Sequence, residues 1–401
     1  MSNEFEQFVY LNSNSKENTS FLAMGCKAIF DPKENQVFEG LKQFVDQHQD
    51  WLFGYLGYDL KNEVEPSLSS NNLDELNFPN THFFVPKYVL VITKNSTVLH
   101  YTKENEKDEF LALLEEKQQK KKEKQQKIEF SQRISKEEYI EKFAKIKHHI
   151  QQGDIYEMNF CHEFYANNVE LDPVEAYLKL NELTNAPFSA FYKNSTQFIL
   201  SASPERYIKK EGTKIITQPI KGTAKRGETK EEDELIKLEL SQNEKERSEN
   251  IMIVDLVRND LSKTAIKTSV KVEELCKVYR FDTVHQMIST VTSQVKESTH
   301  PVEVLRTTFP MGSMTGAPKV EAMKIIEEVE TTKRGVYSGT IGYFTPEGDF
   351  DFNVIIRTLL YNKEKRNLSF MVGGAITSKA NAEQEYAETF LKAEALINSL
   401  K

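Results

Sequence analysis

Apolar positions recur at helical spacing in the stretch that follows residue 135. The set is Tyr139, Phe143, Ile146 and Ile150. Ser135 and Glu138 form a capping box ahead of it, and Gly153 follows it. This arrangement predicts a helix that ends at the glycine.

Alternating apolar positions follow and predict strands. In 154–166 (DIYEMNFCHEFYA) one face carries Tyr156, Met158, Phe160 and Phe164, while Glu157 is expected to point the other way. Earlier in the chain, 51–60 and 82–93 are also typical of strands. Residues 214–220 (KIITQPI) predict a half-buried strand that Gly222 breaks.

Three later runs predict an antiparallel meander: 339–344, 350–361 and 367–377. The first two are joined by TPEG, which is typical of a tight turn. Arg357 falls in the middle strand, where it is either a satisfied edge cation or an anion-binding group. With helices interspersed among antiparallel strands, the fold class is mixed α/β (α+β); no repeat and no GxGxxG or GxxxxGK[ST] motif occurs.

Composition indicates an ordinary globular protein, with 39% apolar and 28% charged residues and no apolar run long enough to span a bilayer. The first residues lack a signal pattern. The cysteines, Cys26, Cys161 and Cys276, are widely spaced and indicate neither a disulfide framework nor a zinc site. We therefore expect a cytoplasmic protein with reduced thiols and no membrane contact.

The net charge of −9 argues against nucleic-acid binding. The basic run at 118–127 is typical of a solvated helix end or linker, with a nucleic-acid contact as the less favoured alternative. Because the whole chain is acidic, an anionic substrate would need cations gathered locally at its site.

Two predicted helices carry carboxylates one turn apart. Glu246 and Glu249 precede an apolar stripe at Ile251, Val254, Val257 and Leu261, and the second pair is Glu385 and Glu388. Four such carboxylates could hold Mg²⁺. Solvated helix faces carry the same spacing more often, and Lys392 could simply pair with Glu388.

Other positions admit two interpretations each. Lys221, between the predicted strand and Gly222, is a surface cation or an amine held at the mouth of a site. The start of the helix at Thr315 to Lys319 suits an anionic ligand or is ordinary capping by Thr315. Gly373 and Gly374 mark a close approach by ligand or a bulge.

Taken together, these segments resemble a known family. GDIYEMNF, SASPERY, PIKGT, ENIMIVDLVRNDL, TFPMGSMTGAPKVEAM, RGVYSGTIGYF, VIIRT, GGAIT and EYAETFLKA occur in this order over 153–393. The series resembles the chorismate-utilising enzymes, and FGYLGYDL extends the likeness to the N-terminal part. The resemblance implies a two-lobed fold of antiparallel sheets in a sandwich flanked by helices, with 1–127 as its N-terminal part and basic linker and 128–401 as the chorismate-binding catalytic region.

The position of Lys221 separates branches of that family. Members similar to anthranilate synthase component I usually have alanine there, whereas those similar to aminodeoxychorismate synthase component I have lysine. The resemblance implies that Lys221 attacks C2 of chorismate as a nucleophile, that Glu205 is the general acid for the C4 hydroxyl, and that ammonia then attacks C4 to give 4-amino-4-deoxychorismate, a precursor in folate and p-aminobenzoate synthesis.

The resemblance also implies a metal and a substrate site. Glu249 and Glu388 would be the leading Mg²⁺ ligands, with Glu246 and Glu385 contributing directly or through water. The implied chorismate-binding residues are Arg357, Tyr337, Gly373, Gly374, Lys392, Lys319, Thr223 and Ser313. Two positions depart from the family: Gln286 stands where histidine is frequent, with His285 beside it, and Glu157 stands where amine-transferring members usually have glutamine.

The ammonia source would be a partner. The sequence has no GxCxG motif of a glutamine amidotransferase, so a separate glutaminase subunit is implied. Two alternatives stay open: an anthranilate-forming component I, which would release pyruvate, and a non-catalytic chorismate-binding scaffold subunit.

Overall fold

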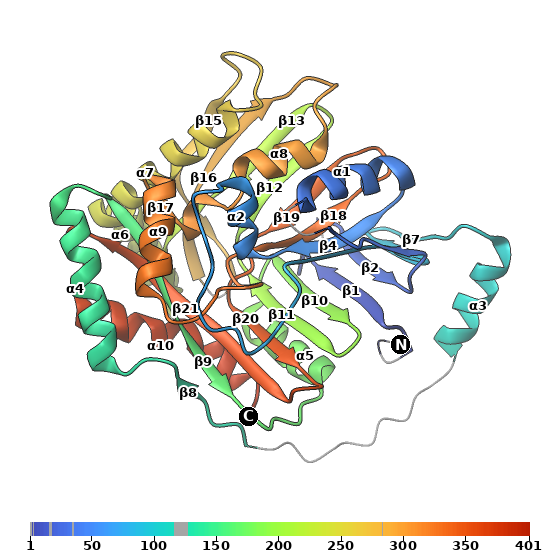
Figure 1. Ribbon diagram of the computed structural model, residues 1–401, viewed down its shortest axis with the longest axis horizontal. Helices are drawn as coiled ribbons and strands as arrows, with labels where there is room; N and C mark the ends of the chain where they lie inside the picture. The colour runs from blue at the N-terminus through green and yellow to red at the C-terminus, as the bar shows by residue number, and fades with distance from the viewer. Residues whose placement is uncertain (1, 3, 16–17, 34–35, 116–126, 283) are drawn as a thin grey trace.

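The computed structural model describes residues 1–401 except 1, 3, 16–17, 34–35, 116–126 and 283. The described residues form two antiparallel sheets with helices around them (Figure 1). The first sheet runs in the order β17 (Gly316–Ala317), β9 (Glu157–Ala166), β21 (Asn367–Thr377), β20 (Thr358–Asn362), β11 (Gln197–Ser203), β10 (Phe188–Asn194), β1 (Gln7–Asn12), β2 (Ser20–Met24), β6 (Tyr88–Ile92) and β7 (Thr97–His100), with β8 (Ser131–Gln132) beside β9.

The second sheet runs in the order β14 (Ile220–Lys225), β16 (Val284–Gln294), β13 (Lys214–Gln218), β12 (Arg206–Glu211), β19 (Phe350–Asn353), β18 (Thr340–Phe344), β4 (Leu52–Leu56), β5 (Thr81–Val85) and β3 (Ala28–Ile29), with β15 (Lys271–Arg280) beside β16. The α-helices are α1 (Val37–His48), α2 (Lys61–Val64), α3 (Glu104–Glu115), α4 (Lys136–Gln152), α5 (Pro173–Thr184), α6 (Lys230–Gln242), α7 (Glu244–Ser262), α8 (Pro301–Thr308), α9 (Lys319–Val329) and α10 (Ala382–Asn398).

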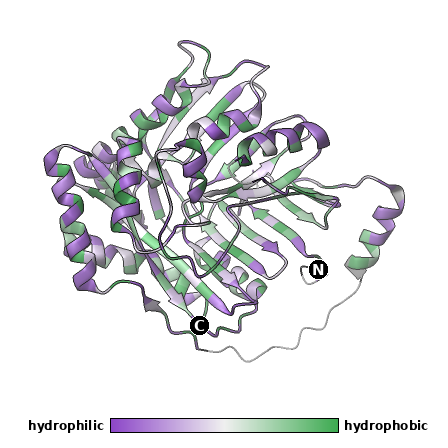
Figure 2. Cartoon of the chain, viewed as in Figure 1, coloured by the Kyte–Doolittle hydropathy of each residue, from purple (hydrophilic) through white to green (hydrophobic). Residues whose placement is uncertain are grey.

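The two sheets pack face to face. Val9 and Ile199 of the first sheet share one buried cluster with Phe53, Phe84 and Ile341 of the second. A second cluster joins the first sheet to α5 and α10, and a third joins the second sheet to α1, α7 and α8. Figure 2 shows apolar and polar residues mixed along the helices, as expected of elements with one buried face. This arrangement confirms the predicted α+β sandwich flanked by helices.

Several predicted elements are confirmed and others are wrong in detail. Helix α4 has the full capping box at Ser135 and ends at Gly153 in the left-handed conformation. Strand β13 alternates between buried and half-buried positions. Tyr156 was assigned to the apolar face of the strand predicted at 154–166, but that strand, β9, begins one residue after Tyr156, and Tyr156 is 65% exposed. On α7 the buried face includes Ile253 in place of the predicted Ile251, which is exposed.

Two predicted strands are each two strands in different sheets. The stretch 82–93 divides into β5 and β6 around Pro86, which cannot donate to a ladder. The stretch 350–361 divides into β19 and β20, and Arg357 lies in the crossover between them with φ of 51°. The predicted three-stranded meander is therefore wrong: β18 and β19 pair in the second sheet, and β20 and β21 pair in the first.

The role predicted for Gly222 is also corrected. It does not end a strand but lies within β14 with φ of 81°, where the pairing with β16 gains one extra residue between Ile220 and Thr223. A bulge of this kind uses the positive φ that glycine adopts without strain. Thr315, considered as a helix cap, instead donates to the carbonyl of Gly312, and α9 has Pro318 at its N-cap.

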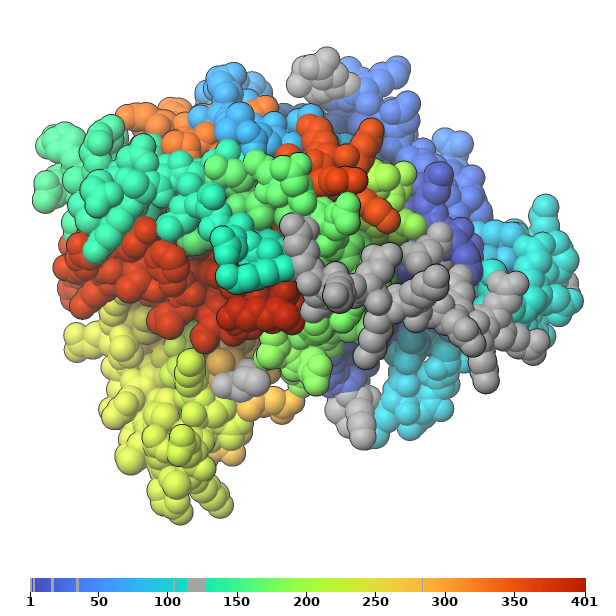
Figure 3. Space-filling view, turned by 90° about the horizontal axis from the view of Figure 1, so that it is seen from below, coloured from blue at the N-terminus to red at the C-terminus, as the bar shows by residue number. Residues whose placement is uncertain are grey.

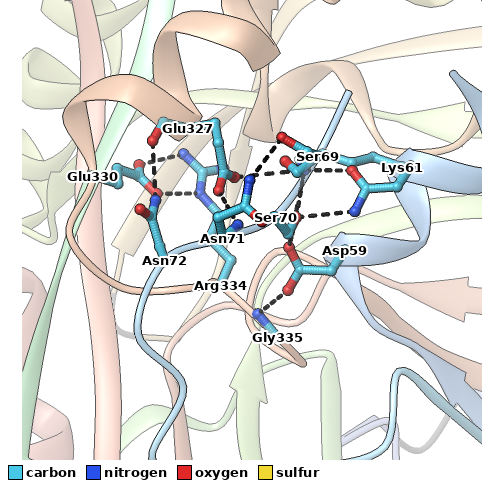
Figure 4. A network of polar contacts seen from close by, with 11 residues as sticks. Asp59, Lys61, Ser69, Ser70, Asn71, Asn72, Glu327, Glu330, Arg334 and Gly335 are labelled. Carbon is cyan, nitrogen blue, oxygen red and sulfur yellow. Dashed lines mark hydrogen bonds and ion pairs between the residues drawn. The ribbon is translucent and has the colours of Figure 1, made fainter. Parts of the chain in front are cut away.

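A network of polar contacts connects residues 59–72 to the C-terminal half of the chain (Figure 4). Asp59 accepts from the backbone N–H of Gly335 at 2.9 Å, and the fully buried Lys61 lies 3.7 Å from Glu327 on α9. In the same view Arg334 pairs with Glu330. The predicted boundary at 127 stays a prediction, and the basic run lies outside the described residues except for its last lysine.

Among the described residues, no helix combines the length and the apolar character that crossing a membrane requires.

Candidate active site

Lys221 joins the two sheets. It lies on β14, next to the bulge at Gly222, and its Nζ is 3.0 Å from Oε1 of Glu157, the first residue of β9. The Glu157 side chain is buried and that of Lys221 is mostly covered, with exposed fractions of 2% and 13%. Gly222 also leaves space for Glu246 on α7, because a Cβ at position 222 would lie 3.1 Å from Oε2 of that side chain. The bulge therefore places the lysine among carboxylates from other elements.

Glu205 lies in the turn between β11 and β12 and is buried. Burial raises the pKa of Glu205 to about 7, although a hydrogen bond from Ser313 and the charges of Lys221 and Arg357 act in the opposite direction. Near neutral pH this carboxyl is thus half protonated, as a proton donor should be.

Lys221 has the opposite electrostatic balance. Burial acts to lower its pKa, but the negative charges of Glu157, Glu249 and Glu205 outweigh burial and raise the pKa above its usual value. The amine is therefore an ammonium ion in the ligand-free protein.

Arg357 approaches Glu205 from the crossover between the sheets. Its backbone carbonyl accepts from the N–H of Ala202 at the end of β11, which fixes the turn. Burial lowers the pKa of Arg357, and the charge of Glu205 opposes that shift. Within the described residues no carboxylate lies within ion-pair distance of this guanidinium, so the satisfied-cation interpretation loses its support and anion binding is favoured.

The two carboxylate pairs come from α7 and α10, and a lysine lies between them. Lys245 Nζ is 4.0 Å from Oε1 of Glu249 and 3.3 Å from Oε1 of Glu385. Burial raises the pKa of Glu249 to about 7, and burial likewise raises the pKa of Glu385. The sequence analysis missed Lys245, although its position four residues before Glu249 is a usual ion-pair spacing.

Glu388 completes the second pair at a more open position. Its Oε1 is 2.9 Å from Lys392 Nζ, so the ion pair considered from the sequence is present. Burial would raise the pKa of Glu388, but the charge of Lys392 and its hydrogen bond lower it. Figure 3 shows α10, in red, between α4 in teal and the yellow-green region that contains α6.

The donor chemistry at these helices fits a hard divalent cation. Oε1 of Glu249 is buried and has no hydrogen-bond partner among the described residues. A cation already lies between Glu249 and Glu385, in the form of the Lys245 ammonium. In the described part of the chain no three His, Cys, Asp or Glu side chains converge as a ready metal cluster. A metal would therefore have to displace Lys245 and draw the carboxylates together.

Gly373 and Gly374 are required by close contacts and not by a bulge, since β21 pairs with β9 in continuous register. A Cβ at Gly373 would lie 2.2 Å from the carbonyl oxygen of Phe160. A Cβ at Gly374 would lie 3.1 Å from Oε2 of Glu385. Lys392 donates to the carbonyl of Gly373 at 2.7 Å, so the glycines and α10 border the same space.

Two predicted substrate residues make other contacts, and a third is exposed. Lys319 is bonded to Asp260 and to the carbonyl of Thr308, so its charge is already neutralised away from Lys221. Tyr337 is buried with its hydroxyl 3.7 Å from Sγ of Cys161, the strand partner of Gly373. Thr223 is exposed on β14. These contacts do not place the three side chains with Glu205 and Lys221.

His285 does not replace the missing histidine. Its Nε2 lies 2.8 Å from Asp233 on α6, and its side chain is fully buried there. Gln286 is also buried and, as the next residue along β16, points to the opposite face of the strand.

Comparisons with known proteins identify the family of this chain. The family model described as chorismate binding enzyme matches residues 6–398. Aminodeoxychorismate synthase component 1 of Escherichia coli is 36% identical over 354 residues, which cover 88% of this chain and 77% of that protein. The protein of the same name from Salmonella typhimurium is 42% identical over 264 residues, covering 66% of this chain and 58% of that protein.

Among solved structures, anthranilate synthase component I from Streptococcus pneumoniae has a TM-score of 0.81 at 26% identity, covering 97% of this chain and 90% of that one. A match of the family model over nearly the whole length, together with the relatives above, is decisive. The chain belongs to the family of chorismate binding enzymes.

Proposed function

We propose that this chain aminates chorismate at C4, giving 4-amino-4-deoxychorismate, as component I of an aminodeoxychorismate synthase. The observation that carries the proposal is a buried primary amine, Lys221, between a carboxylate at 3.0 Å and Glu205, a carboxyl whose pKa lies near 7. An amine nucleophile beside a protonated acid suits displacement of a hydroxyl. The names of the relatives at 36% and 42% identity support the same activity.

The residues divide the reaction into two displacements. Lys221 first loses its ammonium proton to solvent and then attacks C2 of chorismate, the ring double bonds shift, and the C4 hydroxyl leaves as water with the proton of Glu205. Ammonia then attacks C4, the double bonds shift back, and the bond between C2 and Lys221 breaks. Glu205 is suited to its step because half of it is protonated near pH 7.

The substrate carries two carboxylates, and the site offers cations for them. Arg357, without a carboxylate partner among the described residues, would bind one carboxylate from the crossover between the sheets. Lys392 and the backbone at Gly373 and Gly374 border the other side of the site. Ser313 bonds Glu205 and thereby orients the acid.

Mg²⁺ would be held by Glu249 and Glu388, with Glu246 and Glu385 contributing directly or through water. When bound, the ion would supply a Lewis acid for the ring carboxylate of chorismate and would offset the negative charge at Glu249. That charge is among those that raise the pKa of Lys221, so neutralising it favours the free amine that attack requires.

Ammonia would come from a separate glutaminase subunit, because the sequence has no glutaminase nucleophile motif. The relatives named component 1 support a two-component enzyme. Cytoplasmic location stays a prediction of the sequence.

The test is to incubate the purified chain with chorismate, Mg²⁺ and ammonium chloride and to identify the products by mass. Aminodeoxychorismate without pyruvate supports the proposal. Anthranilate with pyruvate would instead establish the alternative component I, and absence of any product together with unchanged chorismate would favour the scaffold alternative.

A further inference from the structure

Among the described residues, Glu157 is the one acidic residue that contacts the proposed nucleophile directly. It begins β9, where its backbone pairs with Ala317 on one side and with Thr377 on the other. Its Oε1 is bonded to Lys221 at 3.0 Å, but its Oε2 is buried and has no hydrogen-bond partner among the described residues. The side chain is 1% exposed. One oxygen thus holds the nucleophile and the other is unused.

An unpaired buried carboxylate oxygen needs a donor in the working protein, because leaving it unsatisfied is costly. Its surroundings restrict what that donor can be. Glu157 and the neighbouring Glu249 and Glu205 are acidic, and Lys221 already uses Oε1. A second anion would be repelled, so the missing partner is a cation or a neutral N–H or O–H donor small enough to fit beside Lys221.

Of the reactants in the proposed function, ammonium fits this description. Chorismate would approach with two carboxylates, which the acidic groups repel and Arg357 attracts. Ammonium is positive and carries four N–H donors. The carbon that it attacks, C4, is separated by one ring atom from C2, the carbon that Lys221 attacks. A carboxylate within hydrogen-bond reach of Lys221 Nζ therefore lies close to the path to C4.

We propose that Oε2 of Glu157 binds ammonium and takes the proton that ammonium must lose before it reacts. This inference rests on the proposed function. An N–H bond of ammonium breaks and its proton passes to Oε2. The nitrogen lone pair forms the bond to C4, the ring double bonds shift, and the bond from C2 to the Lys221 nitrogen, which carries two hydrogens, breaks with its electron pair staying on nitrogen. The freed neutral amine takes the proton from Glu157, which restores the ion pair seen in the structure.

This role for Glu157 explains why position 157 is not the glutamine that amine-transferring members of the family usually have. A glutamine amide can accept a hydrogen bond from ammonia, but it does not serve as the base for ammonium at neutral pH. A glutamate at the same position adds that base, so this chain should use free ammonium well.

The experiment compares Glu157→Gln with wild type in the ammonium-dependent reaction at saturating Mg²⁺, with ammonium and chorismate each varied in turn while the other is saturating. KM for ammonium is expected to rise about tenfold or more, the size expected for losing a hydrogen bond to a charged group, while KM for chorismate changes little. The matched control is Glu163→Gln, on the same strand, whose buried carboxylate bonds Arg133 and Ser369 and not Lys221. The control is expected to keep the wild-type KM for ammonium.

The experiment distinguishes failure of the proposed function from failure of this inference. If wild type makes no aminodeoxychorismate, the proposed function falls and this inference with it. If wild type makes it and Glu157→Gln lowers kcat while keeping the wild-type KM for ammonium, Glu157 only positions Lys221 and the inference alone is overturned. If Glu157→Gln does not fold, as judged by thermal melting, Glu157→Asp decides: withdrawing the carboxylate by one methylene should raise KM for ammonium, and an unchanged KM overturns the inference.

Discussion

The two ends of the candidate site are built in opposite ways. Lys221 lies on a strand, is buried, and is held to one carboxylate at 3.0 Å. The four candidate metal ligands lie on two helices, and a long lysine side chain, Lys245, spans the gap between Glu249 and Glu385. At the first end the amine of Lys221 is already held in position beside a carboxylate. At the second end the ammonium group of Lys245 offsets the charge of the carboxylates, and a metal ion could replace it. The difference indicates that the sheets fix the position of the nucleophile, whereas the net charge of the site changes at the helices when a metal ion replaces Lys245.

Removing the nucleophile should have the largest effect. Lys221→Ala is expected to lower formation of aminodeoxychorismate by at least about 10³-fold, because within the part of the chain that the structure describes no other amine is held beside Glu157 and Glu205. The measurement is product formation with ammonium at saturating Mg²⁺. Lys225→Ala, on the exposed end of the same strand, serves as the control and should stay close to wild type. Full activity of Lys221→Ala would remove the lysine from the mechanism.

A carboxylate at the helical end should be needed for Mg²⁺ and not for the fold. Glu249→Gln is expected to raise the Mg²⁺ concentration for half-maximal activity about tenfold or more, since a carboxylate ligand is lost. Glu388→Gln should act in the same direction. Glu244→Gln, on the exposed start of the same helix, is the control. An unchanged magnesium titration for Glu249→Gln would show that the metal is bound elsewhere.

Burial of Glu205 should make the stability of the folded protein depend on pH. Glu205 has a pKa of about 7 in the folded protein, above its ordinary value, so the folded state binds more protons than the unfolded state between about pH 4.5 and 7. Stability is therefore lost as pH rises through this window, by up to about 3 kcal/mol. Glu205→Gln does not titrate and should gain stability relative to wild type between pH 5 and pH 8 in urea unfolding. A pH-independent difference would mean that Glu205 is ionised throughout.

The internal cation should compete weakly with the metal. Lys245→Met is expected to lower the Mg²⁺ concentration for half-maximal activity by up to about fivefold, because a half-exposed ion pair contributes at most about 1 kcal/mol. A larger thermal shift on adding Mg²⁺ than in wild type should accompany it. A weaker response to Mg²⁺ would make Lys245 part of the binding site instead of a substitute for the ion.

The sequence predicted correctly those elements that are determined by residues close together along the chain. The capping box at Ser135 and the alternation in β13 are confirmed because neighbours in the sequence decide them. Arg357 was placed in a strand because 350–361 is mostly apolar, and nothing local records that the chain changes sheets there. The role of Lys319 at the substrate stays a prediction, and its contact with Asp260 was missed because Asp260 comes from a different helix that the sequence does not place beside it.

The members of the candidate site were named from the sequence, but their electrostatics were not. The roles of Lys221, Glu205 and the carboxylate pairs stay predictions, and the structure brings Lys221 close enough for its charge to act on Glu205 and Glu249. Attack requires an amine that is unprotonated for part of the cycle, but in the ligand-free structure three carboxylates from separate elements surround the amine and raise its pKa. Such an arrangement depends on tertiary packing and leaves no pattern along the chain.

The most direct measurement of the central claim is the mass of the intact protein after it is mixed with chorismate and Mg²⁺ in the absence of ammonium. A covalent intermediate on Lys221 predicts a mass increase of one chorismate less one water, absent in Lys221→Ala and discharged on adding ammonium with release of aminodeoxychorismate. A wild-type protein that forms aminodeoxychorismate with ammonium yet never carries this added mass, or carries it at another residue, would contradict the account.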